Sequence, residues 1–312
     1  LSMLKNDKPK VSLGIPVFNE SKYIAETINS LLSQTYENIE IIAIDNNSDD
    51  NSFNLLESLS KKDKRLKIFK NTKNIGMSKN FNLVFERSTG KYFAWIGAHD
   101  IYKNDFVEKL IHKLENTKDA AVAFTNISKI DSSGKKFEIN KQTGFELYSS
   151  SSFLRQLKIP WKITGSGDIV MGIFNKKILS KTTLFLNSIL WSDVFLIYQI
   201  SKLGKIIRIN EDLRLRRYFR DDEKKFENWE EKYKTIISRF RDEKKLSHKN
   251  LKNNYSFPVL SFGWKLILIM GLKKVYNPTN LLFSIYMSFI FVAFRWRAII
   301  IEFKNYNSKN ND

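Results

Sequence analysis

Apolar residues recur along residues 11 to 125 with two alternating periods. Compact runs such as Val11–Ile15 and Ile39–Ile44 predict buried strands, and apolar residues at helical spacing, such as Ile24 and Ile28, predict helices between them. This alternation of strands and helices predicts an α/β fold with a mainly parallel, Rossmann-like sheet. Such sheets bind ligands beyond the carboxyl ends of their strands, so the residues that follow each strand are the first candidates for a site.

The pattern changes after residue 125. Ile169–Phe174 is apolar enough to predict a further strand. Asp193–Leu203 predicts a helix that ends at Gly204, and Lys205–Ile209 predicts the strand that follows it. We therefore expect the α/β architecture to continue beyond the first half, with less regular alternation.

The last part of the chain combines dense charge with long apolar stretches. Residues 221 to 252 carry charges of both signs, which indicates a solvated connector, and the chain turns apolar and aromatic from Phe257. Pro278–Phe294 is an uncharged stretch of 17 residues, at the lower limit for a ~20-residue spanning helix. Flanking Lys, Arg and Trp are typical of amphipathic helices in a membrane interface. A core or dimer-forming helix pair is the alternative.

Composition narrows the function classes. The formal net charge is +19, and from Gly204 onward 23 Lys and Arg stand against 12 Asp and Glu, so basic charge accompanies the apolar helices. This favours an anionic membrane surface over nucleic acid as the partner. The absence of cysteine excludes disulfides and thiolate metal sites, and His99, His112 and His248 lack metalloprotease spacing. Leu1–Lys10 has no apolar core, and we expect the protein on the cytoplasmic side of the membrane.

Polar residues follow the second predicted strand. Asp45 opens a run of Asn, Ser and Asp whose side chains suit a base edge or ribose hydroxyls. The alternative is a loop whose Asn and Asp side chains cap the next helix. No GxGxxG follows the first strand and no GxxxxGK[ST] is present, which excludes the usual dinucleotide and Walker-type sites.

Two further positions could carry chemistry. His99 and Asp100 follow the fourth strand directly, where they could share a divalent cation with phosphate oxygens; a simple strand-to-helix turn is the alternative. Asp193 stands at the start of its predicted helix, where it could act as a general base or only cap the helix.

Together these segments resemble a known family. Residues 10 to about 125 resemble the nucleotide-sugar-binding half of family-2 glycosyltransferases, which have the glycosyltransferase-A fold. The resemblance rests on VSLGIPVFNE (Val11–Glu20), LLSQTY (Leu31–Tyr36), IEIIAIDNNSDDNS (Ile39–Ser52), NIGMSKNFN (Asn74–Asn82) and STGKYFAWIGAHD (Ser88–Asp100). A weaker match in WSDVFLIYQISKLGKIIRI (Trp191–Ile209) is similar to the family's acidic segment that carries the base.

The resemblance implies a role for each matching residue. It assigns donor contacts to Pro16, Phe18, Glu20, Asp45, Asn46, Asn74, Gly76, Ala98, Arg217 and Arg220. Asp193 would be the catalytic base, and a divalent cation, Mn²⁺ or Mg²⁺, would bind at His99 and Asp100. The chain departs from the family's Asp-x-Asp-Asp motif, because it has Gly97-Ala98-His99-Asp100 there and His99 stands at the principal metal-binding aspartate. This Ala-His-Asp sequence is typical of a subgroup of the family. The chain also departs where Phe81 replaces an arginine and Asn46 a second aspartate.

The resemblance implies a division into units and an activity. Residues 1–220 would form the catalytic domain, with a nucleotide-sugar half (10–125) and an acceptor half (126–220), followed by the connector and membrane-associating helices (221–312). The expected enzyme is an inverting, metal-assisted hexosyltransferase, peripheral or C-terminally anchored, that uses a nucleotide-diphospho-sugar, with a UDP-sugar favoured. Val292 occupies the glutamine position of the processive Gln-x-x-Arg-Trp signature, so single additions to a surface glycan or lipid-linked acceptor are expected.

Two rival functions stay open. A sugar nucleotidyltransferase uses a related sheet, but it would normally carry a Gly-rich loop with Arg or Lys after the first strand, which Pro16–Glu20 is not. A non-catalytic basic binding module would leave the candidate residues as caps and turns. We expect no nucleic-acid partner, and homodimer formation stays open.

Overall fold

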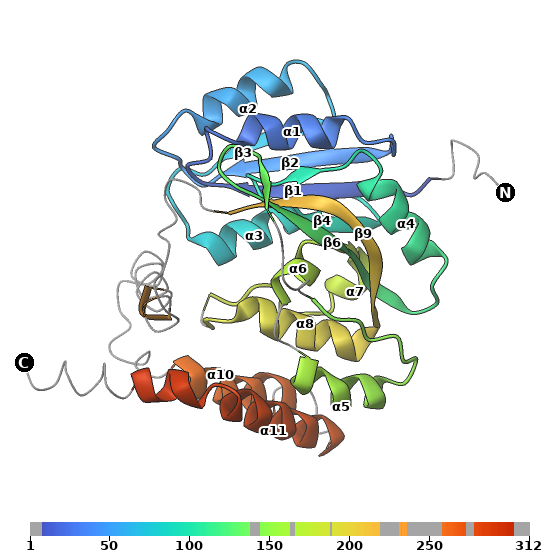
Figure 1. Cartoon of the computed structure of the whole chain (residues 1–312), viewed down its shortest axis with the longest axis vertical. Helices are drawn as coiled ribbons and strands as arrows, with labels where there is room; N and C mark the ends of the chain where they lie inside the picture. Colours follow the sequence, from blue (N-terminus) through green and yellow to red (C-terminus); the bar gives the residue numbers. More distant parts are fainter. Residues whose placement is uncertain are drawn as a thin grey trace, which may run out of the picture.

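The computed structural model describes residues 8–137, 144–162, 166–187, 189–218, 231, 233–235, 258–272 and 278–302. Helices cover both faces of a central curled sheet, and a separate layer of helices lies below it (Figure 1). The described strands are β1 (Val11–Val17), β2 (Ile39–Asp45), β3 (Leu66–Lys70), β4 (Tyr92–Trp95), β5 (Ile101–Tyr102), β6 (Ala120–Ile130), β7 (Lys136–Phe137), β8 (Ile173–Asn175) and β9 (Lys205–Arg217).

The described helices alternate with these strands and then form the C-terminal layer. They are α1 (Ile24–Leu32), α2 (Ser52–Ser60), α3 (Met77–Glu86), α4 (Phe106–Glu115), α5 (Ser152–Lys162), α6 (Ser166–Val170), α7 (Lys176–Leu179), α8 (Ser192–Leu203), α10 (Pro258–Leu266), the π-helical segment η1 (Ile267–Leu272) and α11 (Pro278–Ala293).

The first half of the sheet is parallel. Strands β3, β2, β1 and β4 lie side by side in that order, and Val11 pairs with Ile39 on one side and Tyr92 on the other. Because parallel strands bring their carboxyl ends to one edge, the segments that follow β1, β2 and β4 meet there. The predicted α/β fold is confirmed.

The second half of the sheet mixes directions. The order continues β8-β6-β9-β5, with β6 and β9 parallel and the remaining pairs antiparallel. The predicted strand Ile169–Phe174 is wrong in its first part, because Ile169 lies in α6 and the strand β8 begins at Ile173. The chain turns between them at Gly172, where an added Cβ would lie 2.4 Å from the carbonyl oxygen of Ala123.

Alternation along the strands divides the core between the two faces of the sheet. On one face, Ile42 and Ile44 of β2 belong to a hydrophobic cluster that also contains Trp95 and Phe195. On the other face, Ile41 and Ala43 belong to a second cluster, which includes buried side chains of α1 and α4. The first cluster also contains buried side chains of α10 and α11. The C-terminal helices are therefore packed onto the rest of the described structure through α8, where Phe195 contacts Phe262, and through α5, where Phe153 contacts Phe283.

The predicted apolar stretch near the C-terminus forms α11. Among the described residues, no single helix is long and apolar enough to cross a membrane, although the bent pair Thr279–Ala293 and Trp296–Glu302, at 71°, meets the length and composition criteria together. The charged connector at 221–252 and the boundary at residue 220 lie largely outside the described residues, so the predicted division into domains stays a prediction.

A buried carboxylate joins the amino-terminal ends of the parallel strands. Glu40 is 2% exposed and accepts hydrogen bonds from Ser12 Oγ (2.7 Å), the Thr89 N–H (2.7 Å) and Lys67 Nζ (2.8 Å), while Lys10 Nζ lies 2.9 Å away. Burial alone would raise the pKa of Glu40, but these hydrogen bonds outweigh it and hold the pKa well below its usual 4.5.

Replacing Glu40 by Gln tests this contribution to stability. Because the folded-state pKa is depressed, the stabilisation is full above about pH 4.5 and is lost progressively as the pH falls. We expect Glu40→Gln to lower the free energy of unfolding, measured by urea denaturation at pH 7, by about 2 kcal/mol. The difference from wild type should narrow below about pH 4.5. The exposed Glu57→Gln is the control, expected within about 0.5 kcal/mol of wild type. A difference that does not change with pH would contradict the assignment.

Candidate functional site

A cavity of about 690 Å³ opens at the carboxyl edge of the parallel strands. Segments after β1, β2 and β4 line it, together with the start of α3, the end of β9 and the turn after α6. The lining residues are Pro16, Val17, Phe18, Glu20, Asn46, Asn74, Gly76, Met77, Asn80, Phe81, Ile96, Gly97, Ala98, His99, Asp100, Gly167, Met171, Arg214 and Arg216. Nine of the residues predicted from the sequence therefore meet in one cavity: Pro16, Phe18, Glu20, Asn46, Asn74, Gly76, Ala98, His99 and Asp100.

Side-chain amides shape the wall before α3. Asn46 donates to Asn74 Oδ1 (2.9 Å), and its own oxygen accepts from Asn71 Nδ2 (3.0 Å) and the Ile75 N–H (3.0 Å). Gly76 donates its N–H to Asn74 Oδ1 (2.9 Å) and has φ +87°, a conformation that glycine adopts without strain. The loop that begins α3 is thus fixed to the end of β2.

Asp45 is not among the residues that line the cavity. It is fully buried, and its carboxylate accepts from both the N–H (3.0 Å) and the hydroxyl (2.5 Å) of Ser48. The predicted donor contact of Asp45 is therefore replaced by a supporting role, in which it holds the loop after β2 while its neighbour Asn46 faces the cavity.

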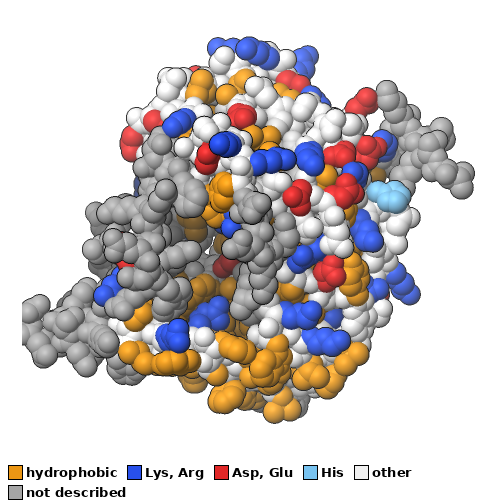
Figure 2. Space-filling model, viewed as in Figure 1, with side chains coloured by type: hydrophobic (Ala, Val, Ile, Leu, Met, Phe, Trp, Pro, Cys, Tyr) orange, Lys and Arg blue, Asp and Glu red, His pale blue; other side chains and the backbone are white. Residues whose placement is uncertain are grey.

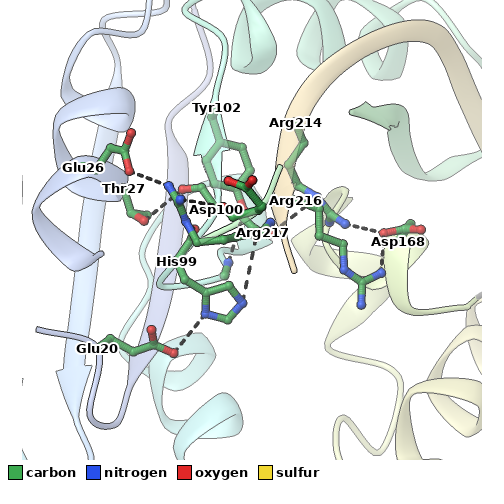
Figure 3. Close-up of polar contacts among 12 residues, drawn as sticks. Glu20, Glu26, Thr27, His99, Asp100, Tyr102, Asp168, Arg214, Arg216 and Arg217 are labelled. Atoms are coloured by element: carbon green, nitrogen blue, oxygen red, sulfur yellow. Dashed lines mark hydrogen bonds and ion pairs between the residues drawn. The ribbon is translucent and has the colours of Figure 1, made fainter. Parts of the chain in front are cut away.

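His99 lies at the mouth of the cavity beside Glu20. Its Nδ1 is 2.9 Å from Glu20 Oε1, and its Nε2 is 3.9 Å from Asp100 Oδ1 (Figure 3). The His99 side chain is 25% exposed. The contact with Glu20 fixes the ring orientation and directs Nε2 toward the neighbouring carboxylate.

Asp100 is buried and held from several sides. Its Oδ1 accepts from the Arg217 N–H (3.1 Å), and its Oδ2 lies 3.6 Å from Arg214 Nε. Its carbonyl oxygen accepts from Thr27 Oγ1 (2.9 Å). The carboxylate therefore faces β9, between the cavity and a buried guanidinium.

Arg217 does not line the cavity, contrary to its predicted donor contact. Its guanidinium donates to the carbonyl oxygens of His99 (3.0 Å), Asp131 (3.0 Å) and Ser132 (3.2 Å), and to Glu26 Oε2 (2.5 Å) (Figure 3). Strand alternation is the reason, because Arg217 points to the opposite face of β9 from its neighbour. Arg220, the other predicted arginine, lies outside the described residues.

Arg214 and Arg216 line the cavity instead, on the same face of β9. Both pair with the buried Asp168 Oδ1, Arg216 at 3.2 Å and Arg214 more closely (Figure 3). Burial lowers the pKa of Arg214, but Asp168 and Asp100 outweigh it and raise the pKa, so the guanidinium stays charged. Arg216 is 38% exposed and offers the cavity a charged donor for anions.

Sequence reasoning missed Arg214 and Asp168. The alternation in Leu213–Arg217 could have indicated Arg214 had the strand been extended beyond its predicted end at Ile209, because residues two apart share a face. Asp168 carries no comparable signal, since it lies in the five-residue helix α6 and only tertiary packing brings it to β9.

The structure does not bring Asp193 to the cavity wall. It lies in the first turn of α8, and its charge acts on Arg295 near the C-terminal helices. Burial lowers the pKa of Arg295 to about 10, with Asp193 opposing that shift. The segment before α8 does reach the cavity wall, because the rings of Phe185 and Phe81 are 5.0 Å apart.

The chain matches known proteins over more than half of its length. The sequence profile of Glycosyl transferase family 2 matches residues 12–181. An uncharacterized glycosyltransferase of Haemophilus influenzae is 43% identical over 107 residues, which cover 34% of this chain and only 33% of that relative. Glycosyltransferase GlyG of Streptococcus pneumoniae serotype 4 is 27% identical over 213 residues, which cover 66% of this chain and 70% of GlyG.

Solved structures share the fold at low sequence identity. S. aureus TarS 1–349 in complex with UDP-GlcNAc has a TM-score of 0.54 at 15% identity, covering 88% of this chain and 79% of that one. The mannosyltransferase PcManGT from Pyrobaculum calidifontis, in complex with GDP-Man and Mn²⁺, has a TM-score of 0.54 at 12% identity, covering 94% and 77%. Because the family profile matches residues 12–181, which are more than half of the sequence, the chain belongs to glycosyl transferase family 2.

Proposed function

We propose that the protein transfers a sugar, with inversion, from a nucleotide-diphosphate donor to an acceptor hydroxyl. The observation that carries this proposal is the cavity in which four separate chain segments of the predicted donor site converge. Its volume of about 690 Å³ suits a small organic ligand, and its walls combine apolar side chains with a few polar groups. Membership of a family of glycosyl transferases supports the reaction type.

Arg216 is the residue in the cavity best suited to the donor diphosphate. It is partly exposed, and Asp168 holds it from behind. A guanidinium held in this way offers paired N–H donors to phosphate oxygens with little loss of side-chain entropy. A UDP-sugar is the favoured donor, with support from the neighbour TarS, whose structure contains UDP-GlcNAc; the neighbour with GDP-Man makes a guanosine donor the alternative.

The chain can supply part of a divalent cation site. Among the described residues, no three His, Cys, Asp or Glu side chains converge where they could hold a metal ion. His99 and Asp100 would supply two ligands, and Mg²⁺ and Mn²⁺ commonly take substrate phosphate oxygens for the rest. These two residues therefore fit a site that the donor completes. A bound cation would offset the negative charge on the departing diphosphate.

Asp193 is the proposed general base, on the resemblance of its segment to the family's acidic segment. Its place in the first turn of α8 follows a loop that packs on the cavity wall through Phe185. Asp168, a further carboxylate beside the cavity, is less suited because Arg214 and Arg216 both pair with it, so that it is already used to hold the two arginines. Asp193 would deprotonate a hydroxyl of a glycan or lipid-linked acceptor in a single-addition reaction.

Donor binding tests the proposed function directly. UDP-GlcNAc or GDP-Man should raise the melting temperature, since a ligand that binds the folded state stabilises it. Arg216→Gln should weaken donor binding about tenfold, as expected for the loss of one charge-assisted contact of about 1.5 kcal/mol. Arg87→Gln, at the end of α3 outside the cavity, is the matched control. Isothermal titration calorimetry measures donor binding by both variants, and unchanged binding in Arg216→Gln would exclude this arginine from the donor site. In a turnover assay, release of pyrophosphate would favour a nucleotidyltransferase.

Metal binding should depend on the nucleotide. Because the chain offers two ligands, we expect weak Mn²⁺ binding by the protein alone and at least tenfold tighter binding in the presence of UDP, measured by the paramagnetic resonance of free Mn²⁺. His99→Ala should remove most of this gain, whereas the exposed His112→Ala should not. His99→Asp should shift the preference from Mn²⁺ toward Mg²⁺. Equal Mn²⁺ binding with and without UDP would contradict a donor-completed site.

Asp193→Asn separates catalysis from a role in the stability of α8. Asp193 lies in the first turn, after the N-cap Trp191, so Asn removes only a favourable interaction with the helix dipole of about 0.3–1 kcal/mol, and the melting temperature and UDP affinity should change little. Loss of a general base should lower the rate of nucleoside diphosphate release by about two to four orders of magnitude. Asp168→Asn is the comparison, and it should weaken donor binding because it releases both arginines. Near-normal turnover in Asp193→Asn would exclude it as the base.

A further inference from the structure

Two helices from different parts of the chain expose large apolar side chains on the same side of the molecule. Hydrophobic side chains gather along the lower edge in Figure 2, where Figure 1 places α5, α10 and α11. We define the docking face by the six exposed residues Phe153, Leu157 and Trp161 on α5, and Leu282, Ile285 and Phe289 on α11. Phe289 is 70% exposed and Trp161 58%, which is unusual for side chains of this size.

Direct contacts make α5 and α11 one surface. The rings of Phe153 and Phe283 are 5.2 Å apart, and those of Trp161 and Phe294 are 5.5 Å apart, both edge to face. Trp161 Nε1 also donates to Tyr286 Oη (2.5 Å). The face is therefore a fixed feature that joins the acceptor half to the C-terminal helices.

Helix α11 is apolar on both its inner and its outer side. Its inner side is buried, with the rings of Phe291 and Phe262 stacked 4.0 Å apart. Its outer side exposes Leu282 and Phe289, and its 16 residues include no charged side chain. A helix that is hydrophobic all round normally lies in a protein core or in lipid. The outer side of α11 is therefore expected to contact lipid or another protein surface.

The charges around the face are cationic. The exposed charged residues of α5 are Lys158 and Lys162, and Arg297, after α11, is also exposed. Both lysines line a cavity of about 650 Å³ that is formed by α5, residues 146–149 and Tyr286 of α11, and in which Glu146 is the acidic residue. Near an anionic membrane each Lys or Arg contributes about 1 kcal/mol of attraction.

We propose that α5 and α11 dock together, in the plane of the interface, on a bilayer that contains anionic lipids. The apolar side chains would enter the acyl boundary while the flanking cations meet the headgroups. The sequence indicated only the C-terminal helices, whereas the structure adds α5 from residues 126–220. A second copy of the chain fits less well, because a two-fold contact through this face would bring Lys158 and Lys162 near the same cations of its partner.

Vesicle sedimentation of the full chain tests this proposal without any use of the proposed activity. We expect binding to vesicles of phosphatidylcholine mixed with phosphatidylglycerol, weaker binding to phosphatidylcholine alone, and a decrease with salt. Leu157→Ser with Trp161→Ser should lower the partition coefficient at least tenfold, because each buried side chain contributes about 1.5–3 kcal/mol. Both positions are exposed and lie outside the donor cavity, so donor binding should stay close to wild type, and the melting temperature should fall only by the small amount expected for loss of the Trp161 contacts with Tyr286 and Phe294.

A charge-reversal pair provides the matched control. Lys158→Glu with Lys162→Glu should abolish the preference for anionic vesicles, whereas Lys61→Glu with Lys64→Glu, at the end of α2 on the far side from α11 in Figure 1, should preserve it despite the same change in net charge. Equal losses in both pairs would show a general charge effect and overturn the proposal. A different pair of results would also overturn the proposal. The wild-type protein would fail to bind vesicles, and analytical ultracentrifugation would show a dimer that Leu157→Ser with Trp161→Ser dissociates.

Discussion

The placement of the site depends on one buried guanidinium. Arg217 at the end of β9 joins the turn after β4, helix α1 and the turn between β6 and β7 by hydrogen bonds to His99, Glu26 and Asp131. A buried arginine is stable only when its donors are satisfied, so these three segments must meet at one point. The same residue supplies the N–H that holds Asp100. The first, parallel part of the sheet and the strands β6 and β9 are thereby fixed to each other where the cavity opens.

The parallel half of the fold could be predicted because its signals are local. Buried strands such as β1 and β2 are predominantly apolar runs, and α1 repeats its apolar positions at helical spacing. The end of β9 could not be recognised in the same way. Its five residues Leu213–Arg217 contain three arginines, which suggest a solvated loop until pairing with β6 buries two of them. That pairing is tertiary, and the local pattern shows only a short alternation of Leu and Arg, which does not by itself separate a strand from a solvated loop.

The same distinction explains which of the predicted site residues lie in the cavity and which lie behind its wall. Resemblance identifies the end of a strand, and His99 and Asn46 do lie in the cavity as expected. It does not identify the direction of each side chain, and a shift of one residue reverses the face. Asp45 and Arg217 are both one position away from a cavity residue and both support the wall from behind. Asp168 reaches the site only through packing of a short helix.

The amide network around Asn46 has a consequence for how the protein responds to its surroundings. Its hydrogen bonds connect only carboxamides and peptide groups, through Asn71, Asn74, Ile75 and Gly76. Such bonds neither gain nor lose protons near neutral pH, and salt screens them far less than it screens ion pairs between exposed charges. The hydrogen bonds that hold the loop before α3 therefore keep their strength across the acidity and ionic strength that cells experience.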